Sequence, residues 1–439
     1  MTIASGGTIS FALDGSSPSV RLAQSGQEAV LAVLRITGTN EELGVKQIAF
    51  QLSNTASNTP QDLSSITLWD GSNQVGTAIL TSLDNATATL SNFTIPKDGS
   101  KNLTVKGVIG NIGVNQPARP GHLVTVDWDR DASSDNLNSA TYAVGVQSST
   151  NVYASRTAGD TASAGARIVR AYPSFSILSV PSTSLADASQ KSLYRFSVTP
   201  TSGANGVSLF KFTFSIATSA DETANPDFTI QSLRLYAFTA SNFSGGAFSS
   251  DGQLNNGTTF FSSEGGNDAV ENDRATTTDY AIYFNPANPN NTGANSREAI
   301  NVPAGSTYYF ELRGDVSGAD SGDSATVQLM GDDRWHGFCD NAGVCQDNGF
   351  LAGSINYAYA TTAPFLDDGS VNVRSGGKNV GVTGVHADDN QSGDDLIWSG
   401  NSTTTHSGGT DNIMGADWYN GFVVPGLPSS GGTTNSFSL

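Results

Sequence analysis

The residues of this chain with the clearest capacity for chemistry are carboxylates in two acidic turns. The first turn places Asp127, Asp129 and Asp131 at every second position, and the second contains the adjacent pair Asp332 and Asp333. Carboxylate oxygens on turns are the hard ligands that calcium requires, although neither turn has the glycine and distal glutamate of an EF-hand loop. The sequence therefore leaves two hypotheses open for these five residues, a solvated acidic turn and a calcium site.

The chain has two cysteines, Cys339 and Cys345, separated by five residues. In an exported protein they can close a short disulfide loop, which is the pairing predicted here. Free thiols are the alternative. Zinc is disfavoured, because a structural zinc site needs four ligands and no histidine pair lies beside these cysteines.

Catalytic motifs are not found in the sequence. The four histidines do not form a His-Glu-x-x-His helix, and no Gly-x-Ser-x-Gly elbow occurs. The pair Asp394 and Asp395, close to Trp398, is the best candidate for glycoside hydrolysis, and a turn before a short strand is its alternative. We therefore expect a protein that is not an enzyme and that has no cofactor other than calcium.

A cluster of aromatic and apolar residues lies near the end of the chain, flanked by Gly and Ser. Its members are Trp418, Tyr419, Phe422, Val423, Val424 and Leu427. Such a cluster must be covered, either by the chain's own second domain or by a neighbouring subunit. The second alternative predicts a role in assembly, in which the extended segment adds to the edge of a neighbour's sheet.

The strands that would position these residues come from a pattern that occurs twice. Residues 31–37 align without gaps on residues 193–199, and at the same offset residues 48–52 align on 210–214. Apolar residues recur at every second position, which is typical of a strand with one buried face. Further matches join 66–69 to 233–236, 95–96 to 302–303, 103–107 to 310–314, and 124–126 to 327–329. The pattern predicts that Phe50 and Phe212 occupy equivalent core positions, and that Phe210, Phe212 and Phe214 share one buried face.

Each copy consists of about seven short strands separated by turns rich in Gly, Asn, Asp and Ser. This is the sequence form of a β-sandwich, so we predict an all-β protein with two tandem immunoglobulin-like β-sandwich domains and a turn-rich C-terminal extension. The expected parts are a first sandwich at 1–130, a linker with edge strands at 131–171, a second sandwich at 172–360 with an inserted loop region at 241–297, and the extension at 361–439.

Charge restricts the partners of the protein. Its formal net charge is −19, so phosphate backbones and anionic lipid headgroups are repelled, and we expect neither nucleic-acid binding nor membrane insertion. No run of 18 apolar residues occurs. Residues 1–7 lack the basic and apolar regions of a signal peptide, and we expect a segment of an exported protein whose leader is absent.

Several short segments resemble the large exported cell-surface proteins of candidate-phyla-radiation (Patescibacteria) bacteria. The segments are residues 4–8, 68–71, 95–98, 103–107, 177–181, 193–198 and 419–428. The resemblance implies an extracellular protein of the surface-layer or appendage type, with no catalytic residues to transfer.

The function expected from the sequence is that of a structural or assembly protein at a bacterial cell surface, a subunit of a surface layer or filament. Its partners would be copies of itself or other surface proteins. One alternative is an adhesin or glycan-binding module that uses exposed aromatic residues such as Trp398, Trp418 and Tyr419. A second alternative is a secreted hydrolase.

Overall fold

A computed structural model of the 439-residue chain gives the fold, which divides into two compact units, residues 1–170 and 171–439. The structure describes residues 6–52, 60–80, 84–113, 115–118, 120–130, 132, 138–156, 161, 163–201, 206–219, 228–254, 260–262, 270–272, 276–284, 300–332, 366–367, 371–375, 378–381, 395–402, 418–427 and 434–439. Throughout these residues the regular structure is β, apart from one short 3-10 turn, so the all-β prediction is confirmed.

Unit 1 consists of a large sheet, a small sheet and the 3-10 turn. Its elements are β1 (Thr8–Leu13), β2 (Arg21–Gln24), β3 (Glu28–Thr39), β4 (Leu43–Leu52), η1 (Pro60–Asp62), β5 (Leu63–Asp70), β6 (Asn73–Ala78), β7 (Asn85–Leu90), β8 (Thr94–Ile95), β9 (Gly99–Ile109), β10 (Leu123–Val124), β11 (Val126–Trp128), β12 (Tyr142–Gly145), β13 (Asn151–Tyr153) and β14 (Ala166–Val169). The large sheet runs in the order β1-β3-β9-β5-β6-β7-β4-β12-β13, with β8 and β11 also paired to β4, and the small sheet runs β10-β14-β2.

The large sheet of unit 1 folds over a single hydrophobic core. Leu34 of β3 and Phe50 of β4 come from opposite parts of the sheet, yet both belong to one cluster of buried side chains. The rings of Phe11 on β1 and Trp128 on β11 stack with their centroids 4.3 Å apart. The two halves of the sheet therefore pack face to face, which is the sandwich arrangement that alternating strands require to bury their apolar faces.

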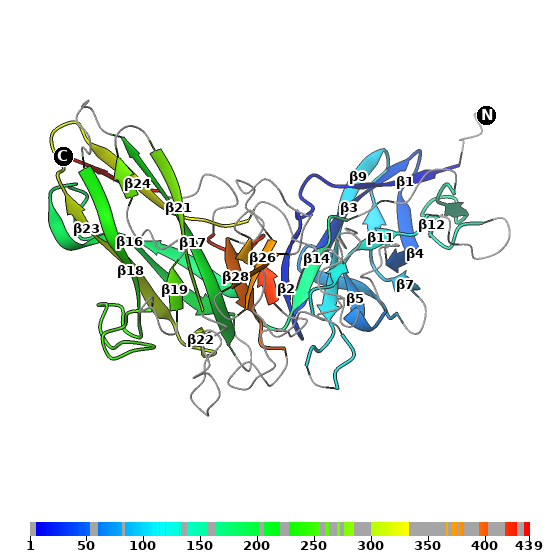
Figure 1. The fold of residues 1–439 in the computed structure, drawn as a ribbon. Coiled ribbons are helices and arrows are strands. Elements are labelled where there is room, and N and C mark those ends of the chain that lie inside the picture. Colours follow the sequence, from blue (N-terminus) through cyan, green and yellow to red (C-terminus); the bar gives the residue numbers. More distant parts are fainter. Residues whose placement is uncertain are drawn as a thin grey trace. The chain divides into compact units, whose positions relative to one another are not determined.

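Unit 2 has two larger sheets and a small one (Figure 1). Its strands are β15 (Pro173–Leu178), β16 (Ala188–Pro200), β17 (Val207–Ser219), β18 (Phe228–Phe238), β19 (Phe260–Ser262), β20 (Val270–Asn272), β21 (Thr276–Phe284), β22 (Ile300–Val302), β23 (Tyr308–Ser317), β24 (Ser324–Leu329), β25 (Leu366–Asp367), β26 (Val371–Ser375), β27 (Lys378–Gly381), β28 (Leu396–Ser399), β29 (Trp418–Asn420) and β30 (Asn435–Ser438). The first sheet runs β15-β16-β23-β18-β20. The second runs β19-β21-β17-β24-β30, with β22 and β28 on β17 and with β29 on β28, and the small sheet runs β25-β26-β27.

Aromatic rings fill the space between the two large sheets of unit 2. Phe196 of β16 and Phe310 of β23 stack at 4.8 Å, and Phe212 of the opposite sheet lies 5.7 and 5.3 Å from them. Phe212 and Phe214 are both fully buried, which confirms the predicted inward face at these two positions, whereas the side chain of Phe210 is outside the described residues. Phe50 and Phe212 are both core residues, as predicted.

The two units share a strand order in one sheet, β1-β3-β9-β5 in unit 1 and β15-β16-β23-β18 in unit 2. Their registers agree at the residues that match in sequence. The corresponding pairs are Leu34–Leu103 with Phe196–Phe310, Leu68–Val105 with Leu235–Leu312, and Leu52–Val126 with Phe214–Leu329.

A bulge also recurs at one place in both units. The ladder shifts register at Leu31 in β3 and at Leu193 in β16. Each leucine covers a glycine of the neighbouring strand: a Cβ added to Gly107 would lie 2.5 Å from Leu31 Cδ1, and one added to Gly314 would lie 2.9 Å from Leu193 Cδ1. A side chain at either position would therefore force the leucine to shift.

The expected linker and the expected C-terminal extension both contribute strands to the sheets of the two units. Strands β12, β13 and β14 fall within the expected linker, and Ala143 and Ile168 on these strands are fully buried in unit 1. Within the expected C-terminal extension, β28 pairs with β17 and β30 pairs with β24. Buried apolar side chains in these short strands complete the cores of the two units.

Candidate binding site on the outer face of unit 2

The outward-facing side chains of two adjacent strands in unit 2 form a charged array. In β23, Phe310 and Leu312 are buried in the core, so Glu311 and Arg313 point to the opposite face of the sheet. Arg195 of β16 lies directly across the ladder from Glu311. Two arginines and a glutamate thus gather on the outer face because strand alternation and register place them there.

Glu311 lies between the two guanidinium groups and is only 1% exposed. Arg195 donates to Oε1 from Nε at 2.8 Å and from Nη2 at 2.7 Å. Arg313 donates to Oε2 from Nε at 2.7 Å and also from Nη2. Each oxygen of the carboxylate is therefore held by one planar guanidinium fork, a geometry that fixes both arginines.

Aromatic rings support the same arginines. The Arg195 guanidinium lies 4.0 Å from the ring centroid of Phe243, and that of Arg313 lies 4.4 Å from Tyr236. The rings of Tyr236 and Phe238 are nearly parallel, with an interplanar angle of 4°. Cation–π contacts of this kind favour a fixed guanidinium position.

Gln190, in β16, links the array to a second carboxylate. It has a positive φ of 53°, its backbone N–H donates to Asp315 Oδ1 at 2.7 Å, and its side-chain oxygen accepts from the Tyr236 hydroxyl at 2.9 Å. The backbone hydrogen bond from Gln190 holds the pKa of Asp315 below its ordinary value.

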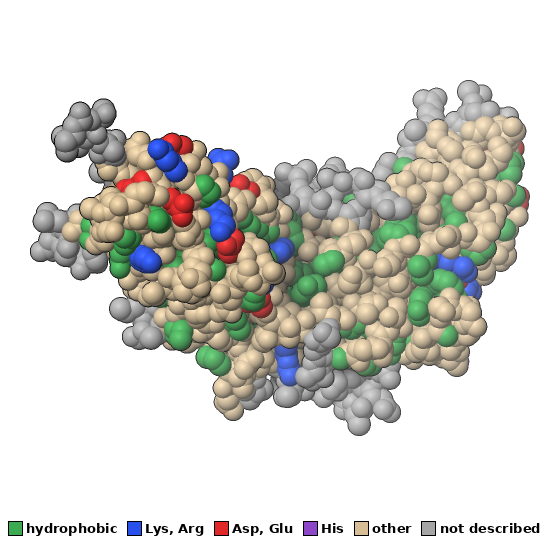
Figure 2. Space-filling view, turned by 180° about the vertical axis from the view of Figure 1, so that it is seen from behind, with side chains coloured by type: hydrophobic (Ala, Val, Ile, Leu, Met, Phe, Trp, Pro, Cys, Tyr) green, Lys and Arg blue, Asp and Glu red, His purple; other side chains and the backbone are tan. Residues whose placement is uncertain are grey.

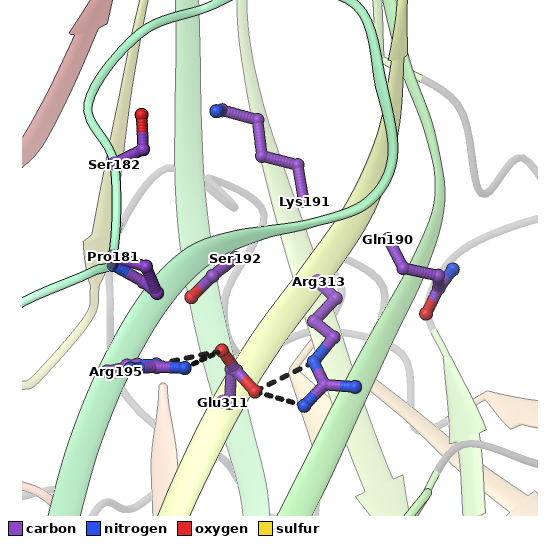
Figure 3. A pocket seen from close by; sticks show the side chains of 8 residues that line it. All are labelled: Pro181, Ser182, Gln190, Lys191, Ser192, Arg195, Glu311 and Arg313. Carbon is purple, nitrogen blue, oxygen red and sulfur yellow. Dashed lines mark hydrogen bonds and ion pairs between the residues drawn. The ribbon is translucent and has the colours of Figure 1, made fainter.

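A cavity of about 290 Å³ opens over this array (Figure 3). Its lining residues are Pro181, Ser182, Gln190, Lys191, Ser192, Arg195, Glu311 and Arg313. Figure 3 shows the Lys191 ammonium and the Ser182 hydroxyl on one side of the cavity and the Arg195–Glu311–Arg313 row on the other. Ser192 Oγ is buried and has no hydrogen-bond partner, and burial lowers the pKa of Lys191 below its ordinary value.

The cavity has a surplus of two positive charges, since it is lined by three cationic side chains and one carboxylate. This contrasts with the whole chain, whose formal charge is −19. On the face shown in Figure 2, a group of basic side chains of unit 2 lies among hydrophobic and polar ones, while basic and acidic side chains of unit 1 are interspersed.

The predicted calcium residues lie in two separate places. Asp127 and Asp129 are buried in unit 1, and their Oδ1 atoms accept from the backbone N–H groups of Ser163 at 3.3 Å and Ala132 at 2.8 Å. Asp332 is fully buried in unit 2. The alternative of a solvated acidic turn is therefore wrong at these three residues. Asp131 and Asp333 lie outside the described residues, and within the described part no group of three metal-ligating side chains occurs.

Asp332 holds two segments of the C-terminal region. Its Oδ1 accepts from the backbone N–H of Asp395 at 2.9 Å, and its Oδ2 accepts from those of Leu396 at 3.5 Å and Gly421. A buried carboxylate is stabilised by several backbone N–H donors. The carboxylate therefore fixes the start of β28 and the end of β29.

The C-terminal cluster packs on its own chain in the described residues. The rings of Tyr419 and Trp398 are 5.0 Å apart, Val424 is 3% exposed, and the Phe175 N–H donates to Pro425 O at 2.8 Å. Phe422, Val423 and Leu427 are half-buried, and Val423 has a positive φ of 54°. The Trp418 side chain is outside the described residues. A role of this segment in assembly stays a prediction.

Trp398 and Tyr419 are not exposed aromatic residues, contrary to the adhesin alternative. Their exposed fractions are 0% and 2%, and Trp398 Nε1 donates to Asn420 O at 2.7 Å. Pairing of β28 with both β17 and β29 covers them. Cys339 and Cys345 lie outside the described residues, so the disulfide stays a prediction. Of the carboxylate pair suggested for hydrolysis, Asp394 also lies outside them, and only Asp395 is described.

Two arrangements were not anticipated from the sequence. One is the Arg195–Glu311–Arg313 array, for which the signal was charged residues at outward positions of matched strands. The other is a buried pair in unit 1, in which His122 Nδ1 lies 2.7 Å from Asp62 Oδ2. The side chain of His122 is only 2% exposed.

Comparisons with known proteins give structural neighbours at low similarity. No family model matches the sequence, and no curated protein matches it. The C-terminal domain of the Streptococcus agalactiae AgI/II polypeptide BspA is 8% identical, with 74% of this chain and 95% of that chain covered and a TM-score of 0.16. The major pilin subunit BcpA of Bacillus cereus is 9% identical, with 74% and 60% covered and a TM-score of 0.20. The collagen adhesin of S. aureus is 12% identical, with 74% and 85% covered and a TM-score of 0.12. Scores this low do not establish a common fold or function.

Across the described residues, no helix has the length and apolar character needed to cross a bilayer.

Proposed function

We propose that this chain is an extracellular cell-surface protein with an adhesive role, acting by non-covalent binding rather than by catalysis. The observation that carries the proposal is the cavity on the outer face of unit 2, lined by side chains of β16 and β23. Binding sites held on strands are more precise than sites on loops, because the sheet fixes the positions of their side chains.

The charge arrangement favours binding over acid–base catalysis. Both oxygens of Glu311 are held by arginine forks, so the lone pairs of the carboxylate are already engaged. A general acid or base needs an oxygen that is free to reach the substrate proton. Glu311 therefore suits the positioning of two cations better than proton transfer.

A binding and turnover assay with the full chain tests this proposal. The chain would be passed over immobilised extracellular polysaccharides and matrix proteins, and the same ligands would be analysed for cleavage products. We expect saturable binding to at least one surface, weakened by Arg313→Gln, with the ligand unchanged. Release of new reducing ends or peptides would contradict the proposal and favour the hydrolase alternative.

A second candidate function is that of a surface-layer or filament subunit. The observation in its favour is the contrast between a cationic cavity and a chain of charge −19, because such opposite patches on one molecule allow head-to-tail contacts between copies. Electron microscopy of the purified chain at low and high salt tests it. Ordered arrays at low salt that dissolve at high salt would support this candidate, and a monomer under both conditions would exclude it.

A further inference from the structure

We infer that the cavity over Arg195, Glu311 and Arg313 binds the anionic group of an acidic saccharide, with a sugar carboxylate as the recognised group. The inference rests on the proposed binding function and specifies its ligand class. It names the ligand of this cavity, so binding of a different surface ligand in the same cavity would leave the proposed function intact.

The first support is the charge of the cavity. Glu311 neutralises one of the two arginines, and Lys191 adds a third cation that pairs with no carboxylate among the described residues. Lys191 is half-buried, and its ammonium lies 5.7 Å from the ring of Phe437. Since partial burial strips water from this ammonium, an arriving anion gains more from pairing with it than with a fully hydrated lysine.

The second support is unused hydrogen-bonding capacity. A guanidinium has five N–H donors, and Glu311 takes two from each arginine. Ser192 Oγ is buried without a partner, and a buried hydroxyl in that state is costly unless something else satisfies it. A ligand oxygen placed in the cavity would accept from these groups.

The third support is the size and composition of the lining. About 290 Å³ is at the lower end of the range for small-ligand sites, so it suits one compact group and not an extended chain. Ser182, Ser192 and Gln190 line the cavity beside the cations. Hydroxyl and amide groups next to an anion site match a ligand with hydroxyls next to a carboxylate, which is the chemistry of a uronic acid.

The corresponding face of unit 1 lacks these features and acts as an internal control. Lys106 occupies the position of Arg313 and pairs with Glu28 at 2.8 Å, while Thr104 stands where unit 2 has Glu311. One cation faces one carboxylate there, without surplus charge. We therefore expect no anion binding on unit 1.

The experiment is a titration of the full chain with glucuronic acid, followed by NMR line broadening of the sugar and by calorimetry, with glucose as the neutral control. We expect glucuronate to bind and glucose not to bind. Lys191→Gln should weaken glucuronate binding about tenfold, the typical effect of losing one hydrogen bond to a charged group. Ser192→Ala should weaken it less. Lys97→Gln, which removes the same charge from an exposed turn of unit 1, should leave it unchanged.

Several results would overturn the inference. One is the lack of glucuronate binding, and another is binding that Lys191→Gln leaves unaltered while circular dichroism shows a native fold. Equal competition by inorganic sulfate would indicate a site for any small anion. Tighter binding of poly-glutamate than of glucuronate oligosaccharides would indicate an acidic polypeptide as the partner. If the chain does not bind glucuronate but still binds an immobilised surface, the assignment of the ligand is wrong and the proposed function stands.

Discussion

Two corresponding sheets, β1-β3-β9-β5 in unit 1 and β15-β16-β23-β18 in unit 2, have the same strand order but carry different charges on their outer faces. In both units a cationic side chain from the third strand of the sheet lies over an aromatic ring of the next strand: Lys106 over Trp69 at 3.8 Å, and Arg313 over Tyr236 at 4.4 Å. In unit 1, Glu28 balances the lysine. In unit 2, the position of Glu28 is taken by Gln190.

This exchange changes what the face can do. Position 190 has no carboxylate, and Arg195 and Lys191 add two cations. Glu311 and Asp315 add two carboxylates, so with Arg313 three cations face two carboxylates beside the cavity of unit 2. The comparison shows that strand register conserves the positions of the outward side chains, whereas the residue types at a few of those positions decide whether the face is neutral or can bind an anion.

Replacement of a core phenylalanine in each unit should have the largest effect. Phe50→Ala and Phe212→Ala remove fully buried rings, and each should cost about 3–5 kcal/mol through lost burial and a residual cavity. Denaturant unfolding of the full chain measures the loss of stability in each of the two variants. A cost under about 1 kcal/mol in one unit only would break the equivalence of the two cores.

Calcium should raise the Tm of the protein through the acidic turn at residues 127–131 and not through Asp332. If residues 127–131 bind calcium in the native state alone, calcium at about 100 times Kd adds roughly 2.7 kcal/mol to stability, measured as a rise in Tm. Asp129→Asn should remove that rise. Asp332→Asn should leave it intact, because Asp332 accepts three backbone hydrogen bonds instead. A Tm that does not respond to calcium or chelator would refute the calcium prediction.

Alanine in place of the two covered glycines should cost less than the loss of a core ring. Gly107→Ala and Gly314→Ala force a Cβ against Leu31 and Leu193, and overpacking of this kind typically costs about 1–3 kcal/mol. Equilibrium unfolding is the measurement. Shortening the leucine in the double variants Gly107→Ala/Leu31→Ala and Gly314→Ala/Leu193→Ala should give a cost smaller than the sum of the two single changes, because the clash is then relieved. Additive costs would show that the leucine does not cause the effect.

Loss of the aromatic ring beneath Lys106 or Arg313 should lower the free energy of unfolding by less than the glycine substitutions do. Trp69→Leu and Tyr236→Leu remove the cation–π contact and keep an apolar side chain, for an expected cost of about 0.5–1 kcal/mol from that contact. The double variants with Lys106→Met or Arg313→Met complete a mutant cycle in each unit. A coupling energy of zero in either cycle would show that the contact is incidental.

The pH dependence of Asp315 should be the smallest effect. Its pKa is lowered in the folded state, so it stabilises unit 2 at pH values above its unfolded pKa of about 3.9, and the stabilisation disappears as pH falls through the lower folded value. Asp315 is partly exposed, so we expect under about 1 kcal/mol. Asp315→Asn should flatten the stability curve below pH 4. An unchanged curve would contradict the role of the Gln190 hydrogen bond. Unit 1 has Val108 at this position and provides no corresponding titration.

The sequence by itself determined the all-β class and the strands at residues 31–37, 48–52, 193–199 and 310–314. Alternation of apolar side chains is a local pattern that follows from strand geometry, so it can be read without knowledge of the partner strand. It also identified Phe212 as a core residue for the same reason.

Only the tertiary structure decided which outward residues meet. Arg195 and Glu311 are 116 positions apart, and they pair because the register of β16 with β23 sets them opposite each other. The burial of Asp332 and Trp398 likewise depends on strands that return from the end of the chain. Contacts between distant strands are set by register and packing, and neither is encoded in any single segment.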